Sequence, residues 1–148
     1  MDYVRLGRTE LKASVMGLGC GGHSRLGQAT GKTEAESAAI VRQALDLGIN
    51  FIDTAEAYGT EPIVGRALQN VPRHSYILST KKSLRQDDRW VTGAELKAGL
   101  ERSLKQLQTD HVDIYHLHGL QPDQYDYACS EWVPALASPR TLHSPRFP

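Results

Sequence analysis

The sequence predicts an α/β fold built on a parallel β-sheet, and two observations support this class. Short segments of strand length alternate with longer segments of helical periodicity, in the order strand, helix, strand, helix, strand, helix, strand. The strand-like segments are largely apolar and do not alternate cleanly between apolar and polar residues, which is typical of strands covered by helices. On this pattern alone, a doubly wound sheet and a (β/α)₈ barrel are both compatible with the chain.

The first predicted elements are a hairpin and a strand. Residues 3–6 and 11–13 flank a turn that contains glycine, which predicts a small β-hairpin. The apolar run at residues 15–18 predicts the first buried strand of the sheet. Residues 19–22, Gly-Cys-Gly-Gly, follow that strand immediately.

A capping box marks the start of the first predicted helix. Thr33 and Glu36 have the spacing at which the two side chains satisfy free amides of the first helical turn. The apolar face ends at Leu47, and Gly48 follows at the position where a left-handed residue is usual. Residues 49–52 then predict the second strand.

The same alternation continues through the rest of the sheet. A short helix is predicted from Pro62, and residues 76–79 predict the third strand. Thr92 and Glu95 form a second capping box, which starts a helix whose leucine stripe runs to Leu107. Residues 112–117 predict the fourth strand.

The C-terminal segment differs in composition from the rest. We expect a domain over residues 1–133 and an irregular tail, rich in Pro, Ser and Arg, over residues 134–148. Four of the seven prolines lie in this tail. Neither a helix nor a central strand tolerates that density of proline.

The overall composition excludes several classes of protein. Lys+Arg and Asp+Glu both number 17, so no basic surplus indicates binding to nucleic acid. No run approaches the roughly 20 apolar residues of a membrane span, and the N-terminus lacks the apolar core of a signal peptide. Two cysteines make no disulfide framework, so we expect a reducing, cytoplasmic setting. No metal site is predicted.

Four polar residues stand at or just past the C-terminal ends of predicted strands: Asp53, Tyr58, Lys81 and His118. Parallel α/β folds bind ligands at this edge of the sheet. An ammonium group favours the ionised form of a nearby phenol, a carboxylate fixes the ammonium, and an imidazole can orient a carbonyl group. Together these groups are suited to carbonyl reduction or its reverse, and they imply a cofactor that carries hydride.

Neighbouring residues of the same types leave two choices open. Lys82 adjoins Lys81, and strand phasing does not choose between them, so we expect one of the two to be merely solvated. His116 and His118 face the same side under strict alternation. Glu56, in the loop after the second strand, is expected to be an acid that faces solvent.

The order of these motifs resembles that of the aldo-keto reductase family. Residues 53–59, Asp-Thr-Ala-Glu-Ala-Tyr-Gly, are similar to its Asp-Thr-Ala-x-x-Tyr-Gly motif. Residues 77–81 resemble its third strand with the catalytic lysine, and residues 112–118 its fourth strand with the histidine. Residues 6–9 and 16–19 resemble its opening hairpin and first strand.

The resemblance implies the N-terminal half of a (β/α)₈ TIM barrel, with four parallel strands and their helices preceded by a β-hairpin. It implies an NAD(P)H-dependent oxidoreductase that reduces an aldehyde or ketone, or oxidises an alcohol or sugar. Tyr58 would be the general acid/base, Lys81 and Asp53 its tuning pair, and His118 the group that orients the carbonyl. The family motifs thereby favour Lys81 and His118 over their neighbours.

The resemblance also assigns the cofactor contacts. Gly19, Cys20, Gly21 and Asp53 would lie along NADPH or NADH, with the glycines leaving room for close backbone approach. A complete barrel of this kind needs about 250 residues, so we expect a truncated chain that binds cofactor weakly and is inactive alone. Open sheet edges predict self-association. The alternative is a non-catalytic interaction module of the same fold.

Overall fold

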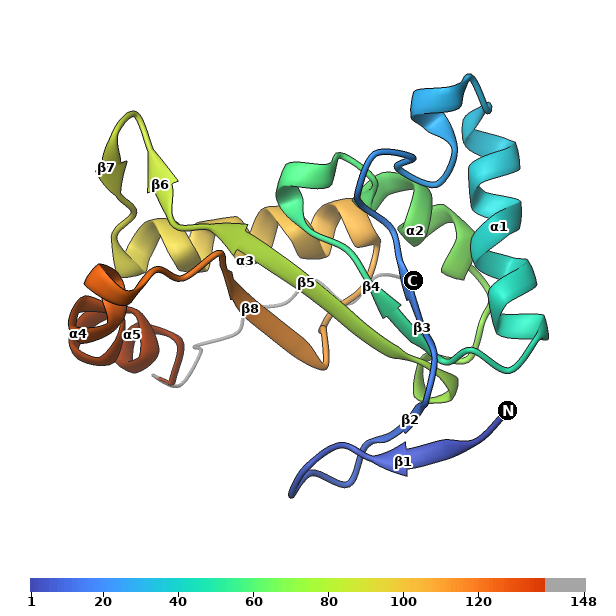
Figure 1. The fold of residues 1–148 in the computed structure, drawn as a ribbon, viewed down its shortest axis with the longest axis horizontal. Helices are drawn as coiled ribbons and strands as arrows, with labels where there is room; N and C mark the ends of the chain where they lie inside the picture. The colour runs from blue at the N-terminus through green and yellow to red at the C-terminus, as the bar shows by residue number, and fades with distance from the viewer. Residues whose placement is uncertain (138–148) are drawn as a thin grey trace.

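The computed structural model in Figure 1 describes residues 1–137 of the chain. The predicted hairpin is present as the antiparallel pair β1 (Tyr3–Arg5) and β2 (Lys12–Ser14). The predicted parallel sheet follows, with its four strands in the order β3-β4-β5-β8. These strands are β3 (Gly17–Gly19), β4 (Phe51–Asp53), β5 (Ile77–Ser83) and β8 (Ile114–His118).

Three crossover helices form one layer against the sheet. They are α1 (Glu34–Asp46), α2 (Glu61–Leu68) and α3 (Gly93–Leu107), and α2 packs between the other two (Figure 1). The strands are added in chain order with no reversal, so right-handed crossovers place every helix on the same side. A doubly wound sheet reverses its strand order and carries helices on both faces. The topology therefore agrees with the barrel.

The capping residues begin the helices as the sequence predicts. Thr33 accepts a hydrogen bond from the Glu36 amide, and Thr92 accepts one from the Glu95 amide, with the reciprocal glutamate bonds also made. Gly48 follows α1 with φ of 85°, the left-handed conformation that glycine adopts at low cost.

The main core lies between the sheet and helices α1 and α2. Its fully buried members include Ile52 of β4, Leu78 of β5 and Val41 of α1. Helices α2 and α3 approach closely at Gly65, where a Cβ atom would lie 2.7 Å from the backbone oxygens of Gln106 and Leu107. The absence of a side chain at Gly65 thus sets the distance between these helices.

The first strand of the sheet is less buried than its apolar sequence predicts. Gly17 and Gly19 of β3 are exposed and Leu18 is half-buried. The physical reason is position, because β3 lies at one edge of the sheet and has a hydrogen-bonded strand neighbour only on its β4 side among the described residues.

A second, smaller core was not anticipated from the sequence. The short antiparallel hairpin of β6 (Arg85–Gln86) and β7 (Arg89–Trp90) extends beyond β5, and a helical segment packs near it (Figure 1). That segment comprises α4 (Tyr125–Tyr127), the π-helical turn η5 (Ala128–Trp132) and α5 (Val133–Ala137). Trp132 is fully buried at the centre of this cluster, against Trp90 and Tyr127.

The prediction of an irregular segment from residue 134 is wrong for its first four residues. Pro134 lies near the start of α5, which runs to Ala137. The Val133 amide donates to the Ala128 carbonyl, five residues back, so regular α-helical bonding is already interrupted immediately before the proline. The remainder of the predicted tail, residues 138–148, lies outside the described residues.

Candidate active site

The four candidate residues are brought together at the C-terminal edge of the parallel sheet. Asp53 ends β4, Lys81 lies late in β5, and His118 ends β8. Tyr58 ends the 3₁₀ turn η2 (Glu56–Tyr58), which follows β4. The parallel register aligns Asp53 with Ser79 and Ser83 with His118, so the ends of these strands are adjacent.

Asp53 and Lys81 form an ion pair across neighbouring strands. Lys81 Nζ donates to Asp53 Oδ2 at 2.5 Å and to the backbone oxygen of Thr54 at 2.8 Å. Ser79 Oγ donates to the other carboxylate oxygen of Asp53 at 2.7 Å. The lysine side chain is 14% exposed, so the pair is largely removed from solvent. The ammonium group is therefore held in one place.

The Tyr58 ring contacts both the lysine and the histidine. Lys81 Nζ is positioned over the Tyr58 ring, 4.9 Å from its centroid. The His118 ring meets the Tyr58 ring edge-on, with centroids 5.5 Å apart and an interplanar angle of 89°. The turn that carries Tyr58 ends at Gly59, whose φ of 70° is left-handed.

Gly21 determines how closely the chain after β3 approaches this tyrosine. A Cβ atom at Gly21 would lie 2.6 Å from the Tyr58 ring carbons Cδ2 and Cε2. Any side chain at this position would displace the ring. The sequence assigned Gly21 only to the cofactor and did not predict this contact with Tyr58. The one signal for it in the sequence is a glycine just after a strand, which often marks a close approach of the backbone to another group.

His118 is held in its neutral form at neutral pH. Burial lowers the pKa of His118 below its usual value of 6.5, and the Lys81 ammonium lowers that pKa further, while Asp53 opposes the shift. A neutral imidazole has one N–H donor and one acceptor nitrogen. His118 is therefore suited to donate a hydrogen bond to a ligand oxygen without carrying charge.

The titration of His118 provides a direct test of this environment. We expect its NMR midpoint in the folded chain to lie below that in the same chain unfolded by urea, and Lys81→Met to raise it. The pKa of His118 is lower in the folded chain than in the unfolded chain, so the unfolded chain binds a proton on His118 more readily. The contribution of His118 to stability is therefore present above about pH 6.5 and is lost as the pH falls. A folded midpoint at or above the unfolded one would contradict the assignment.

The two lysines of β5 point to opposite faces of the sheet, and neither is merely solvated. Lys82 Nζ lies 2.7 Å from Glu56 Oε2, and the Lys82 side chain is only 7% exposed. Glu56 also accepts from Arg102 Nη2 at 3.1 Å, so it is not a solvent-facing loop acid. These two expectations were wrong because the sequence does not show that α3 covers this part of β5.

The two histidines of β8 also differ. His116 is exposed and pairs in register with Lys81, whereas His118 is half-buried and contacts Tyr58. The structure therefore brings His118, and not the exposed ring of His116, against the tyrosine.

The segment predicted to hold a cofactor is only partly available for contact. Cys20 is fully buried in the main core, and burial raises the pKa of its thiol to about 12, with a further contribution from Asp53. Its side chain therefore cannot lie along a ligand. The Cys20 amide donates to the Asp53 backbone oxygen at 2.8 Å. Gly19 is exposed, with open space where a Cβ atom would stand.

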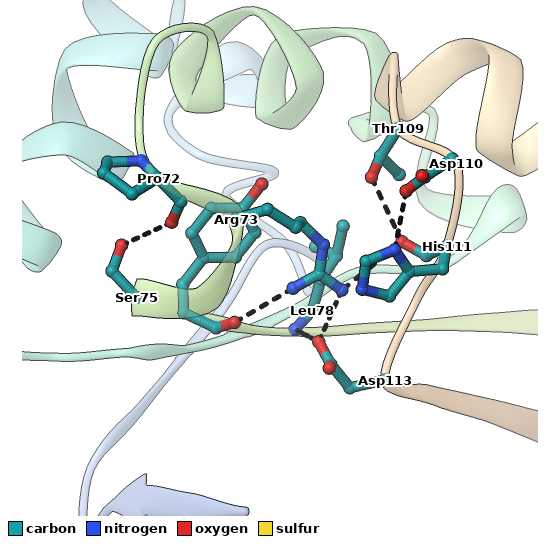
Figure 2. A network of polar contacts seen from close by, with 9 residues as sticks. Pro72, Arg73, Ser75, Leu78, Thr109, Asp110, His111 and Asp113 are labelled. Atoms are coloured by element: carbon teal, nitrogen blue, oxygen red, sulfur yellow. Dashed lines mark hydrogen bonds and ion pairs between the residues drawn. The ribbon is translucent and has the colours of Figure 1, made fainter. Parts of the chain in front are cut away.

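A separate polar network lies at the opposite, N-terminal ends of the strands. Arg73 and Asp113 form an ion pair of 2.6 Å, and Asp113 also accepts from the Leu78 amide at 2.8 Å (Figure 2). In barrels of this type the catalytic groups lie at the C-terminal ends, and residues at this end serve stability. We assign this network to the fold.

Neither a membrane-spanning helix nor a metal-binding cluster occurs among the described residues. None of the helices in residues 1–137 is both long and apolar enough to cross a membrane. Within the same part of the chain, no group of three or more His, Cys, Asp or Glu side chains is arranged to hold a metal ion.

Comparison with known proteins adds a family to this geometry. Residues 17–139 match the model of the Aldo/keto reductase family. The L-galactose dehydrogenase of Arabidopsis thaliana is 36% identical to this chain, and the match covers 96% of this chain and 46% of the dehydrogenase. The aldo-keto reductase YhdN of Bacillus subtilis is 39% identical, covering 82% of this chain and 39% of its own length. The chain thus spans less than half the length of these curated relatives.

Solved structures show the same likeness. The holo form of aldo-keto reductase AKR11C1 from Bacillus halodurans superposes with a TM-score of 0.75 at 33% identity. The match covers 91% of this chain and 45% of that one. The parallel strands, their helices and the opening hairpin thus correspond to about half of a TIM-barrel protein, as the sequence predicts.

Proposed function

Because the chain belongs to the Aldo/keto reductase family, a family of oxidoreductases, we propose that it carries the proton-handling groups of a nicotinamide-dependent carbonyl reductase site. The observation that carries the proposal is the contact of the Tyr58 ring with both Lys81 and His118 at the C-terminal edge of the sheet. This is the edge at which α/β barrels bind substrates.

Each side chain has a distinct role in the proposed reaction. Tyr58 donates a proton to the carbonyl oxygen during reduction and accepts it during oxidation. The Lys81 ammonium, held by Asp53 and the Thr54 carbonyl, stabilises the phenolate that remains after the proton has been donated. His118, neutral at pH 7, donates a hydrogen bond that orients the carbonyl group.

We propose that one end of a nicotinamide cofactor lies along the end of β3 and the residues that follow it. We assign its contacts to the exposed Gly19, the backbone of Gly21 and Asp53, but not to the Cys20 side chain, because that side chain is buried. NADPH or NADH supplies a hydride when bound. With so few contacts assigned, we expect weak cofactor binding and little activity from this chain alone.

The substrate class follows from the same site. We propose a small carbonyl compound or sugar, because the polar groups at the edge of the sheet recognise one oxygen function. The dehydrogenase from Arabidopsis thaliana acts on L-galactose by its name, which is consistent with a sugar or its oxidised form. We also propose a reducing, cytoplasmic setting, to which the free thiols of Cys20 and Cys129 are suited.

The test combines cofactor binding with hydride transfer. NADPH is titrated by its fluorescence, and its aldehyde-dependent oxidation is followed by absorbance. We expect Tyr58→Phe to lower the rate by about 10²- to 10⁴-fold, because it removes the general acid, without weakening NADPH binding. Tyr125→Phe is the matched control, since Tyr125 lies exposed on α4. A Tyr58→Phe variant as active as the control would overturn the proposal.

The second candidate, a non-catalytic interaction module, is favoured by the two edges of the sheet. Exposed residues of β3 and β8, including Gly17 and His116, lie at these edges and offer backbone groups for pairing with another strand. In self-association, the edge strands of a second copy of this chain would pair with the same backbone groups. A stable stoichiometric complex that neither binds NADPH nor oxidises it would select this alternative.

A further inference from the structure

Two consecutive lysines of β5 hold the same loop from opposite faces of the sheet. Lys81 donates to the backbone oxygen of Thr54, just after β4. Lys82 pairs with Glu56, the first residue of the turn η2 that carries Tyr58. The loop between β4 and Tyr58 is therefore fixed at two points by adjacent residues of one strand.

The position of Lys82 is built into the packing of α3 on the sheet. A Cβ atom at Gly99 of α3 would lie 2.6 Å from Cδ of Lys82 and 3.1 Å from its Cε, so this glycine provides the space for the lysine stem. Gly99 itself is buried. A buried ammonium group is costly without a partner, and Glu56 is the partner that this site provides.

Glu56 remains charged in this environment. Burial raises the pKa of Glu56, but hydrogen bonds from Lys82 and Arg102 outweigh that effect and hold its pKa below the usual 4.5. The Arg102 side chain is 56% exposed, so its share of the interaction is screened by solvent. The largely buried Lys82 is thus the stronger of the two partners.

Glu56 and Tyr58 belong to the same hydrogen-bonded turn, so the position of one depends on that of the other. The Tyr58 amide donates to the Ala55 carbonyl at 3.0 Å, and the Gly59 amide donates to the Glu56 carbonyl at 3.3 Å. Only Ala57 separates the two side chains along the chain, so a displacement of Glu56 moves the backbone that carries the phenol. A 1 Å misplacement of a reacting group can cost about 100-fold in rate.

We propose that the Lys82–Glu56 ion pair positions the Tyr58 phenol over Lys81, and that Lys82 is a positioning residue of the active site. Lys82 acts from the helix-covered face of the sheet and does not touch substrate. The effect on reaction rate depends on the function proposed above for Tyr58, whereas the effect on the location of Tyr58 does not.

The experiment reads the Tyr58 location and the reaction rate separately. The full chain is labelled with 3-fluorotyrosine, and the Tyr58 signal in the ¹⁹F spectrum is identified by its loss in Tyr58→Phe. We expect Lys82→Met to shift the Tyr58 signal by more than its linewidth, while the exposed Tyr3 and Tyr125 keep theirs. We expect kcat to fall about 10- to 100-fold with the KM for NADPH nearly unchanged.

Three further variants keep the result interpretable. Lys105→Met, which removes an exposed lysine from α3, is expected to change neither the signal nor kcat. Glu56→Gln is expected to reproduce the effect of Lys82→Met. The double variant is expected to be little worse than Glu56→Gln alone, because that variant already removes the Lys82–Glu56 contact. If Lys82→Met does not fold, Glu56→Gln provides the test.

The possible outcomes separate this inference from the proposed function. A folded Lys82→Met or Glu56→Gln variant with an unchanged Tyr58 signal overturns the positioning role. A Tyr58→Phe variant as active as the wild-type chain counts against the proposed function, while a shifted Tyr58 signal in the Lys82 and Glu56 variants still supports the ion pair as the element that positions Tyr58.

Discussion

Replacing Asp113 by alanine is expected to lower the free energy of unfolding by about 3 kcal/mol. Asp113 Oδ2 accepts from both Arg73 and the Leu78 amide, and the Asp113 and Arg73 side chains are only 15% and 23% exposed. Alanine would leave a largely buried guanidinium without its counter-charge and a backbone amide of β5 without its acceptor. Figure 2 shows these two contacts converging on the one carboxylate.

The same arginine connects two segments of the chain. Arg73 also donates to the backbone oxygens of Tyr76 at 3.1 Å and His111 at 3.3 Å. The network thus ties the residues before β5 to those before β8, and it fixes how these strands enter the sheet. Displacement of either strand would also move Lys81 or His118 at the other end.

Urea unfolding followed by circular dichroism measures the effect. Asp123→Ala is the matched control, because Asp123 is exposed in a short turn and its loss is expected to cost less than about 0.5 kcal/mol. Asp113→Asn, which keeps an acceptor oxygen but loses the charge, is expected to fall between the two. Equal stability of the Asp113→Ala and Asp123→Ala variants would show that the network contributes nothing.

Trp132→Ala is expected to cost about 3–5 kcal/mol, through the cavity that it leaves in the smaller core. Trp132 is fully buried, and its ring centroid lies 5.1 Å from that of Tyr127 and 6.3 Å from that of Trp90. Its indole N–H donates to the Val91 carbonyl at 2.7 Å. Val91 immediately precedes the cap of α3, so the hydrogen bond from Trp132 links the last helical segment to the start of α3.

Two further variants separate volume from hydrogen bonding. Trp132→Phe retains much of the ring volume but leaves the Val91 carbonyl without its donor, so we expect a loss of about 1–3 kcal/mol. Tyr125→Ala removes an exposed aromatic side chain from the neighbouring α4 and is expected to be nearly neutral. The prediction is contradicted if Trp132→Ala unfolds at the same urea concentration as Tyr125→Ala.

The regular elements could be predicted because their signals are local. The capping boxes at Thr33 and Thr92, and the left-handed glycine at Gly48, are satisfied within one turn of chain and appear as predicted. The helical segment around Trp132 was missed because its helices are short and because it contains a π turn and Pro134. It is held by contacts with residues some 40 positions earlier in the chain, such as Val91.

The site shows the same division between local and distant information. The types and order of Asp53, Tyr58, Lys81 and His118 are visible in the sequence, because each follows a recognisable strand. Their convergence is seen in the structure, whereas their chemical roles remain proposals. The buried state of Cys20 and the fit of Gly21 against the Tyr58 ring could not be predicted, since both depend on which loops meet.

The alternation of strands and helices, the family and the four polar residues at the strand ends could all be recognised from the sequence. Hydrophobic periodicity, caps and short motifs carry that information within a few residues. The contacts of Lys81 with Tyr58 and of Lys82 with Glu56 became visible only in the folded chain. Successive residues of a strand face opposite sides, but which side meets α3 depends on packing between distant segments.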